Sequence, residues 1–178
     1  MDILSKKQRS LHMSLIRAEN SRPEILLRSI LHRLGFRFRV NVKTLPGKPD
    51  IVFRKYQAVI FVHGCFWHAH PNCKRARIPS SNRRYWKKKF ERNKENDAKN
   101  IREIKRLGWR PCVVWECQVM KSPQAVAHRV FRFLTGSSLS RGDSSYDFPE
   151  KKELLHVAEK RRNYLIQKKK TQRQATIS

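Results

Sequence analysis

Acidic residues are scarce in this sequence. It has 14 Asp and Glu against 41 Lys and Arg in 178 residues, a formal net charge of +27. Lys and Arg release condensed counterions when they bind phosphates, so this imbalance favours a polyanionic partner, nucleic acid above all. Hydrophobic residues make up 39% of the chain and aromatic residues 10%, which is typical of a folded domain rather than a disordered basic arm.

Long hydrophobic runs are also missing. No apolar stretch approaches the roughly 20 residues of a membrane-spanning helix, and the start at residues 1–4 does not open a signal peptide. We therefore expect no membrane association and a cytoplasmic location. Cysteines number four, and in a reducing compartment their clustering with histidines favours metal binding over disulfides.

The length fits one folded domain with flanking segments, and no internal repeat is visible. We expect a basic N-terminal DNA-binding arm with a short helix over residues 1–20 and a folded domain over residues 21–135. Residues 136–178 are expected to form a flexible linker and a basic tail, which adds unspecific affinity for phosphates.

Periodicity predicts the elements of the folded domain. Ser21 to Glu24 has the pattern of a capping box, and Gly35 supplies a stop for the helix that follows. The further expected elements are strands over 36–40, 50–53 and 58–62, a long helix from Ser81 or Asn82 to about Leu107, a strand over 112–116, and a helix after Ser122. This order implies a layered α/β or α+β fold, with a mixed sheet flanked by helices.

The stretch from residue 63 to residue 73 has the highest density of chemically reactive groups, with three imidazoles and two thiols. Three of them have the spacing to bind one zinc ion, namely Cys65, His70 and Cys73. The fourth ligand must come from afar, and Cys112 and Cys117 are the candidates. A thiol at the end of a strand can reach a loop, whereas one in mid-strand packs in the core, so we choose Cys117. The alternative is a set of buried cysteines without metal.

A zinc ion with four protein ligands has no open position for water, so this metal would be structural. It would fix the shape of a loop that has few residues to form a core. His63 and His68 then remain for chemistry, and His68 is held near the metal scaffold while free to act as a base.

Candidate carboxylates lie elsewhere in the chain. Asp50 starts a strand after a Gly-Lys-Pro turn, and an adjacent strand ends at Val62-His63. These two strands would bring Asp50, the Val62 carbonyl and His63 to one edge, a set of donors that suits Mg²⁺. The alternative for Asp50 is an ordinary turn residue. Glu24 is explained by its capping box.

Asp97 has the spacing of the inward-facing residues Ile101 and Ile104 of the long helix. An inward carboxylate needs a partner, and a catalytic imidazole would serve. The residues together indicate metal-assisted hydrolysis of phosphodiesters, with one imidazole activating water.

The chain resembles the very-short-patch repair endonucleases, which are bacterial DNA mismatch nickases of the restriction-endonuclease-like fold. The resemblance covers about residues 5–135. It is carried by Leu45–Asp50, Val59–Cys73, Asn93–Asp97, Leu107–Trp109 and Trp115–Cys117. It implies a three-layer α/β fold and cutting of double-stranded DNA on the 5′ side of the thymine in a T·G mismatch left by deamination of 5-methylcytosine. It also implies a monomer associated with the bacterial nucleoid, with downstream repair proteins as further partners.

The resemblance assigns roles to the residues at matching positions. Asp50 would be the principal Mg²⁺ ligand, assisted by the Val62 carbonyl. His68 would be the general base, oriented by Asp97. Some members of the family carry a hydroxyl side chain where Val62 stands, so only its backbone can contribute here.

Further roles follow from the same matches. Glu24 and His63 would hold metal-bound waters, and the four zinc positions fall on Cys65, His70, Cys73 and Cys117. Phe66 and Trp67, with Met13 from the N-terminal arm, would wedge into the base stack beside the mismatch. Unstacking costs least at a mispair, so such a wedge selects for mismatches.

Two alternatives to a mismatch nickase stay open. One is a nuclease of the same fold that cuts by sequence. The other is a zinc-stabilised nucleic-acid-binding module without catalysis.

Overall fold

The computed structural model describes residues 19–136 and the single residues 159, 163 and 167. Met13, the expected N-terminal helix and almost all of the expected linker and tail lie outside the described residues. Within the described part, no helix combines the length and the apolar character needed to cross a membrane.

The elements follow the predicted order, with one helix that the sequence did not predict. They are α2 (Arg22–Arg33), β1 (Arg39–Val40), β2 (Ile51–Phe53), β3 (Ala58–His63), α3 (Arg83–Arg106), β4 (Arg110–Trp115), α4 (Glu116–Lys121) and α5 (Pro123–Thr135). Short 3-10 turns occupy Arg54–Tyr56 and Lys74–Ala76. The unpredicted helix is α4.

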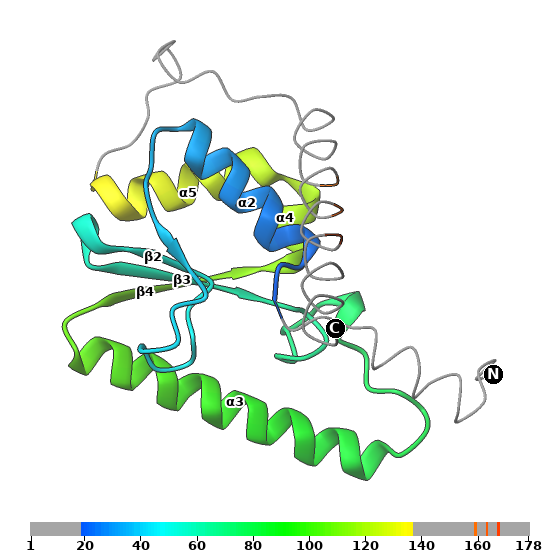
Figure 1. The fold of residues 1–178 in the computed structure, drawn as a ribbon. Coiled ribbons are helices and arrows are strands. Elements are labelled where there is room, and N and C mark those ends of the chain that lie inside the picture. Colours follow the sequence, from blue (N-terminus) through cyan, green and yellow to red (C-terminus); the bar gives the residue numbers. More distant parts are fainter. Residues whose placement is uncertain (1–18, 137–158, 160–162, 164–166, 168–178) are drawn as a thin grey trace, which may run out of the picture.

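Four strands form a mixed sheet in the order β1-β2-β3-β4. The pairs β1–β2 and β2–β3 are antiparallel, and β3–β4 is parallel. Helix α3 connects the two parallel strands and covers one face of the sheet, while α2, α4 and α5 cover the other (Figure 1). The prediction of an α/β fold with a mixed sheet between helices is therefore confirmed.

The core is divided unequally between the two faces. The larger hydrophobic cluster joins α2 and α5 to the sheet, and it includes Leu26, Ile30, Phe53, Ile60, Val130 and Phe131. On the α3 side, the cluster of buried residues consists of Val52, Val59, Phe61 and Ile104. Because α3 is strongly basic and contributes few apolar side chains, it packs tightly on the sheet over only part of its length.

Helix α2 begins as its sequence predicts. The backbone N–H and the hydroxyl of Ser21 both donate to the Glu24 carboxylate, and Pro23 lies in the first turn, where its missing N–H costs nothing. At the other end Gly35 adopts φ +82°, and the N–H of Phe36 donates to the carbonyl of Leu31.

The strand predicted over residues 36–40 is shorter than expected, since only Arg39 and Val40 pair with β2. Phe36 is buried, but its N–H belongs to the end of α2 rather than to the sheet. The strand predicted to end at residue 116 ends at Trp115, and Glu116 starts α4.

Candidate active site and metal centre

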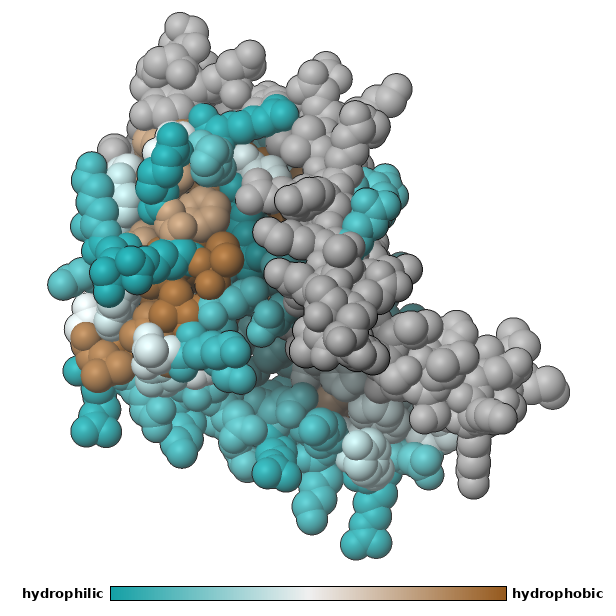
Figure 2. All heavy atoms as spheres, viewed as in Figure 1, coloured by the Kyte–Doolittle hydropathy of each residue, from teal (hydrophilic) through white to brown (hydrophobic). Residues whose placement is uncertain are grey.

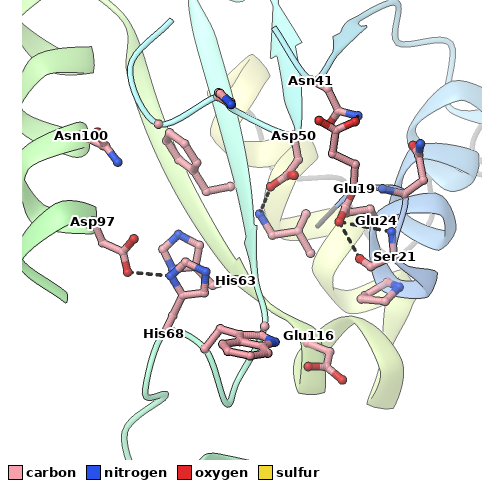
Figure 3. A pocket seen from close by; sticks show the side chains of 18 of the residues that line it. Glu19, Ser21, Glu24, Asn41, Asp50, His63, His68, Asp97, Asn100 and Glu116 are labelled. Atoms are coloured by element: carbon pink, nitrogen blue, oxygen red, sulfur yellow. Dashed lines mark hydrogen bonds and ion pairs between the residues drawn. The ribbon is translucent and has the colours of Figure 1, made fainter. Parts of the chain in front are cut away.

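A cleft of about 940 Å³ lies between α3, the ends of the central strands and the start of α2. Its lining includes the five predicted catalytic side chains, which are Glu24, Asp50, His63, His68 and Asp97. Figure 3 shows Asp97 approaching from α3 and Glu24 from α2, with Asp50 between them. The fold thus brings together residues that are up to 73 positions apart in the sequence.

Asp50 lies immediately before β2, opposite the end of β3. Its Oδ2 accepts a hydrogen bond of 2.7 Å from the N–H of Val62, which fixes the carboxylate at the edge of the sheet. The pKa of Asp50 is raised to about 7, first by burial and then by the negative charge of Glu24. The hydrogen bond from Val62 and the charges of Arg28 and His68 lower it by smaller amounts. The groups around Asp50 therefore compensate its negative charge only in part.

Glu24 is buried and belongs both to the capping box and to the cleft. Its Oε2 accepts hydrogen bonds from the N–H of Asn20 at 2.9 Å and from Arg28 Nη2 at 3.0 Å. The residue pattern explained Glu24 by its capping box, whereas the family resemblance gave it a role in holding metal-bound water, and the structure places it beside Asp50 in the cleft. Arg28 did not stand out in the sequence, because an arginine four residues after a glutamate is common on helix surfaces.

His68 and Asp97 form a hydrogen-bonded pair, with 2.7 Å between Nδ1 and Oδ2. A carboxylate accepts hydrogen bonds, so this contact favours the tautomer in which Nδ1 carries the proton and Nε2 keeps its lone pair. Such an imidazole can take a proton from a molecule in the cleft. The prediction that Asp97 faces inward and meets an imidazole is confirmed.

His63 stacks on His68, with ring centroids 3.9 Å apart and an interplanar angle of 11°. Burial lowers the pKa of His63 to about 4, as does the neighbouring His68, while Asp97 acts in the opposite direction. His63 is consequently neutral at physiological pH and offers a lone pair or an N–H rather than a charge.

The predicted zinc ligands form a second cluster beside the cleft. Their ligand atoms all lie within 4.8 Å of one another, and the residues are Cys65, His70, Cys73 and Cys117. Nδ1 of His70 is 3.6 Å from Sγ of Cys65 and 3.4 Å from Sγ of Cys117. Cys112 packs against the core instead, and burial raises the pKa of its thiol.

These spacings fit a metal ion. Zinc–sulfur and zinc–nitrogen bonds in tetrahedral geometry separate the two donor atoms by about 3.5 Å. Burial raises the pKa of the Cys65 thiol to about 12, so without a cation this thiol keeps its proton. A metal would stabilise the thiolate, and the cluster has the composition of a closed structural site.

The position of Cys117 differs from the prediction in one respect. It lies in the first turn of α4 and not at the end of an extended strand. The chain turns into a helix directly after Trp115, which carries the thiol back toward the loop. The ring of Trp115 also stacks on His70, with centroids 4.0 Å apart.

Glu116 is a residue of the cleft that the sequence did not single out. Its Oε2 accepts a hydrogen bond of 3.3 Å from the N–H of Cys65, and its Oε1 pairs with Arg75 at 3.0 Å. Glu116 therefore joins the cysteine-histidine loop to the start of α4, directly after β4. The signal available in the sequence was its place directly before Cys117.

Phe66 and Trp67, which the family resemblance assigns to a wedge, are half-buried and not fully exposed. Phe66 packs edge-to-face on Trp67 and on two aromatic rings of α3, and its ring centroid is 5.0 Å from that of Trp86 and 5.2 Å from that of Phe90. Asn93 of α3 also donates to the Trp67 carbonyl at 2.7 Å. Helix α3 supplied packing partners that a loop sequence alone does not reveal.

Comparison with known proteins gives a consistent family. Residues 1–75 match the family described as DNA mismatch endonuclease Vsr. The chain is 36% identical over 143 residues to the DNA mismatch endonuclease Vsr of Escherichia coli K12, which covers 78% of this chain and 91% of that protein. It is 45% identical over 118 residues to the type II nicking enzyme V.XorIIP of Xanthomonas oryzae, covering 66% of this chain and 86% of that protein.

A third relative is the type II nicking enzyme V.NmeAIP of Neisseria meningitidis, 44% identical over 118 residues, which cover 66% of this chain and 84% of that protein. All three relatives are named as endonucleases or nicking enzymes, and the matches to them cover at least 84% of each relative's length. On this similarity the chain is a DNA endonuclease that belongs to the Vsr DNA mismatch endonuclease family.

Proposed function

We propose that this endonuclease nicks one strand of double-stranded DNA on the 5′ side of the thymine in a T·G mismatch that arises from deamination of 5-methylcytosine, with Mg²⁺ as catalytic cofactor. The observation that carries the proposal is the common cleft of Asp50 and the hydrogen-bonded pair His68–Asp97. A metal-binding carboxylate and an oriented imidazole in one cleft are the groups that phosphodiester hydrolysis needs.

The magnesium site of this proposal comprises Asp50 and the backbone carbonyl of Val62. Its support is the chemistry of the donors, because Asp50 and Glu24 are two neighbouring carboxylates whose mutual repulsion a divalent cation would relieve. When bound, Mg²⁺ would polarise the scissile phosphate and stabilise the negative charge that develops on it.

The protein side chains supply the proton transfer. His68 acts as the general base, taking the proton of the attacking water on Nε2 while Nδ1–H donates to Asp97. Asp97 keeps the imidazole in this tautomer and stabilises the positive charge that the ring gains. Glu24 and His63 line the same cleft and orient water molecules within it.

Zinc is the proposed structural metal, held by the cluster of Cys65, His70, Cys73 and Cys117. The thiolate and imidazole donors and their spacing support this choice over a hard cation. We propose no catalytic role for it. By closing the loop it positions His68, which lies between the ligands Cys65 and His70, against Asp97 of α3.

Phe66 and Trp67 are the proposed wedge at the mismatch, together with Met13, which lies outside the described residues. Their support is that Trp67 lines the cleft and that the ring of Phe66 packs on it, with centroids 5.2 Å apart. The aromatic contacts with α3 would hold the rings rigid, and a rigid wedge loses less entropy on insertion.

Helix α3 offers the electrostatic part of DNA binding. Lys and Arg far outnumber acidic residues along it, and the surface over α3 is almost entirely hydrophilic (Figure 2). A basic helix on the rim of the cleft would follow the phosphate backbone and give strongly salt-dependent affinity.

We also propose a restriction-endonuclease-like fold, since a mixed sheet between helices carries its candidate site at the strand ends. The enzyme would act as a monomer on the DNA of a bacterial nucleoid in the cytoplasm, followed by downstream repair proteins. The basic residues at 1–20 and 136–178 would add affinity for DNA phosphates to that of the endonuclease domain at 21–135.

The test uses two duplexes of equal sequence, one with a T·G pair and one with the matched C·G pair. We expect Mg²⁺-dependent nicking of the mismatched duplex alone. Asp50→Ala and His68→Ala should abolish cleavage while retaining DNA affinity, whereas His32→Ala at an exposed position of α2 should cut like the wild type.

The outcomes separate the remaining alternatives. Nicking of both duplexes would support a nuclease that cuts by sequence and would contradict mismatch selection. A fully active Asp50→Ala variant would remove the proposed magnesium site. The alternative of a binding module without catalysis is already wrong, because the chain belongs to an endonuclease family.

A further inference from the structure

One buried arginine of α2 connects the segments that carry the two carboxylates of the cleft. The guanidinium of Arg28 donates through Nη1 to Oδ1 of Asn20 at 2.7 Å. Through Nη2 it donates to Oε2 of Glu24 at 3.0 Å, to Oδ1 of Asn41 at 3.1 Å and to the carbonyl of Asp50 at 3.0 Å. These acceptors come from the start of α2, from the loop after β1 and from the residue before β2.

The side chain of Arg28 is only 11% exposed, so this network is shielded from competing water. A guanidinium presents a planar fork of donors at fixed angles, which a lysine ammonium does not reproduce. The contacts therefore define relative positions as well as neutralising charge.

Asp50 is fixed at two points. Arg28 binds its backbone carbonyl, and the N–H of Val62 binds its carboxylate. Glu24 is fixed by the same guanidinium through its carboxylate oxygen. One side chain thus sets the distance between the backbone of Asp50 and the carboxylate of Glu24, which come from different elements.

We propose that Arg28 is a positioning residue for divalent-cation binding in the cleft, acting through the geometry of its guanidinium fork. This inference rests on the proposed magnesium site at Asp50. Arg28 touches neither the cation nor the DNA in this role. It holds the carboxylate of Glu24 and the main chain of Asp50 in the arrangement that the cation requires.

A purely electrostatic role makes the opposite prediction. Arg28 is a positive charge beside two carboxylates, so if its charge alone mattered, its removal would strengthen the binding of Mg²⁺. If its geometry matters, its removal weakens that binding. The sign of the change in affinity separates the two roles.

The experiment titrates Mg²⁺ into the full chain without DNA and follows both binding heat and the rise in melting temperature. We expect Arg28→Gln and Arg28→Lys to weaken Mg²⁺ binding by roughly 10- to 100-fold, the range for residues that orient metal ligands. Arg37→Gln is the matched control and should bind like the wild type, because Arg37 is exposed and its hydrogen bonds within the described residues go to the backbone carbonyls of His32 and Phe36.

Nicking assays give a second readout. In Arg28→Lys the Mg²⁺ concentration for half-maximal rate should rise by the same factor, while the rate at saturating Mg²⁺ stays within about threefold of the wild type. A variant that is merely less stable would lose rate at every metal concentration. Measuring the metal-induced change in melting temperature also removes any difference in baseline stability.

A further variant guards against misfolding of Arg28→Gln. Asn41→Ala removes one acceptor of the fork without leaving a buried unpaired charge, and it should weaken Mg²⁺ binding by a smaller factor. Wild-type Mg²⁺ affinity in both Arg28→Lys and Asn41→Ala would overturn the proposal, as would tighter binding in Arg28→Gln.

Asp50→Asn distinguishes failure of this inference from failure of the proposed function. If Asp50→Asn binds Mg²⁺ like the wild type, the metal site itself is misplaced. If Asp50→Asn loses Mg²⁺ binding while the Arg28 variants keep it, the metal site is supported and the positioning role of Arg28 is wrong.

Discussion

The unusual protonation of Asp50 predicts that a substitution in the active site stabilises the protein. Burial and the charge of Glu24 raise the pKa of Asp50 to about 7 in the folded protein, compared with 3.8 for an ordinary aspartate. The folded state therefore holds a proton on Asp50 at pH values where the unfolded chain has lost it. Without a metal, stability should fall as the pH rises from about 4 to about 7.

The substitution Asp50→Asn keeps the size of the side chain and an oxygen that can accept the Val62 N–H, while it removes the charge. The difference in pKa corresponds to about 4 kcal/mol in the free energy of unfolding, at 1.36 kcal/mol for each pH unit. The variant should gain up to about 4 kcal/mol over the wild type between pH 4 and pH 8.

The assay is urea unfolding of both zinc-loaded proteins at several pH values between 4 and 8, in buffer that contains the same low concentration of free zinc and no Mg²⁺. The quantity of interest is the difference in unfolding free energy between the two proteins, because the titration of all other groups cancels in it. Adding Mg²⁺ at pH 8 should then reduce the difference, since a cation at Asp50 stabilises its charged form.

A difference that stays constant between pH 4 and pH 8 would refute the reasoning. It would mean that Asp50 titrates in the folded protein as it does in the unfolded chain, so that neither burial nor Glu24 acts on it as described. A larger difference in the presence of Mg²⁺ would contradict the placement of the cation.

Three other outcomes are expected. Asp97→Asn removes the negative charge from the hydrogen bond of 2.7 Å to His68 and leaves at most a weaker neutral one, so it should lower the nicking rate about 10- to 150-fold without weakening DNA binding; an unchanged rate would contradict the orienting role. Cys73→Ser should lose bound zinc and melt roughly 5 °C or more below the wild type, whereas Cys112→Ser should retain its zinc. Elemental analysis gives the zinc content and thermal melting gives the stability. Equal zinc content in the two variants would contradict the assignment of the ligands. Gly47 has φ +69°, and a Cβ there would lie 2.9 Å from the Asn100 side chain of α3, so its replacement by Ala should cost about 1–3 kcal/mol in urea unfolding; a cost near zero would show that the turn can shift.

Local patterns predicted much of the fold. The helix at residues 22–33 followed from a capping box and Gly35, and the long helix ends at Arg106, next to its predicted end at about Leu107. These signals act within a few residues of the chain, where spacing translates directly into structure. The strand predicted over residues 36–40 is too long because the N–H of Phe36 bonds to the end of α2 and not to the sheet. The alternation of apolar and polar residues does not show which of these two partners the N–H will take.

The structure places Cys117, and not Cys112, beside the other three residues of the cluster, but in a different element from the one predicted. We expected Cys117 at the end of a strand, whereas the chain leaves the strand at Trp115 and Cys117 lies in the first turn of α4. The structure brings Cys117 to the loop through a helical turn. A six-residue helix has too few turns to give a clear period in the sequence.

The sequence by itself determined which chemical groups this protein has. Its charge indicated a polyanionic partner, and the residues from His63 to Cys73 supplied too many donors for one metal. Tertiary structure decided which groups work together. The stacking of His63 on His68, the pairing of His68 with Asp97, and the neighbouring carboxylates of Asp50 and Glu24 depend on strands and helices that meet only in the folded chain. The pKa values of Asp50 and His63 are likewise decided by burial, because a charge loses its water only after the chain has closed around it.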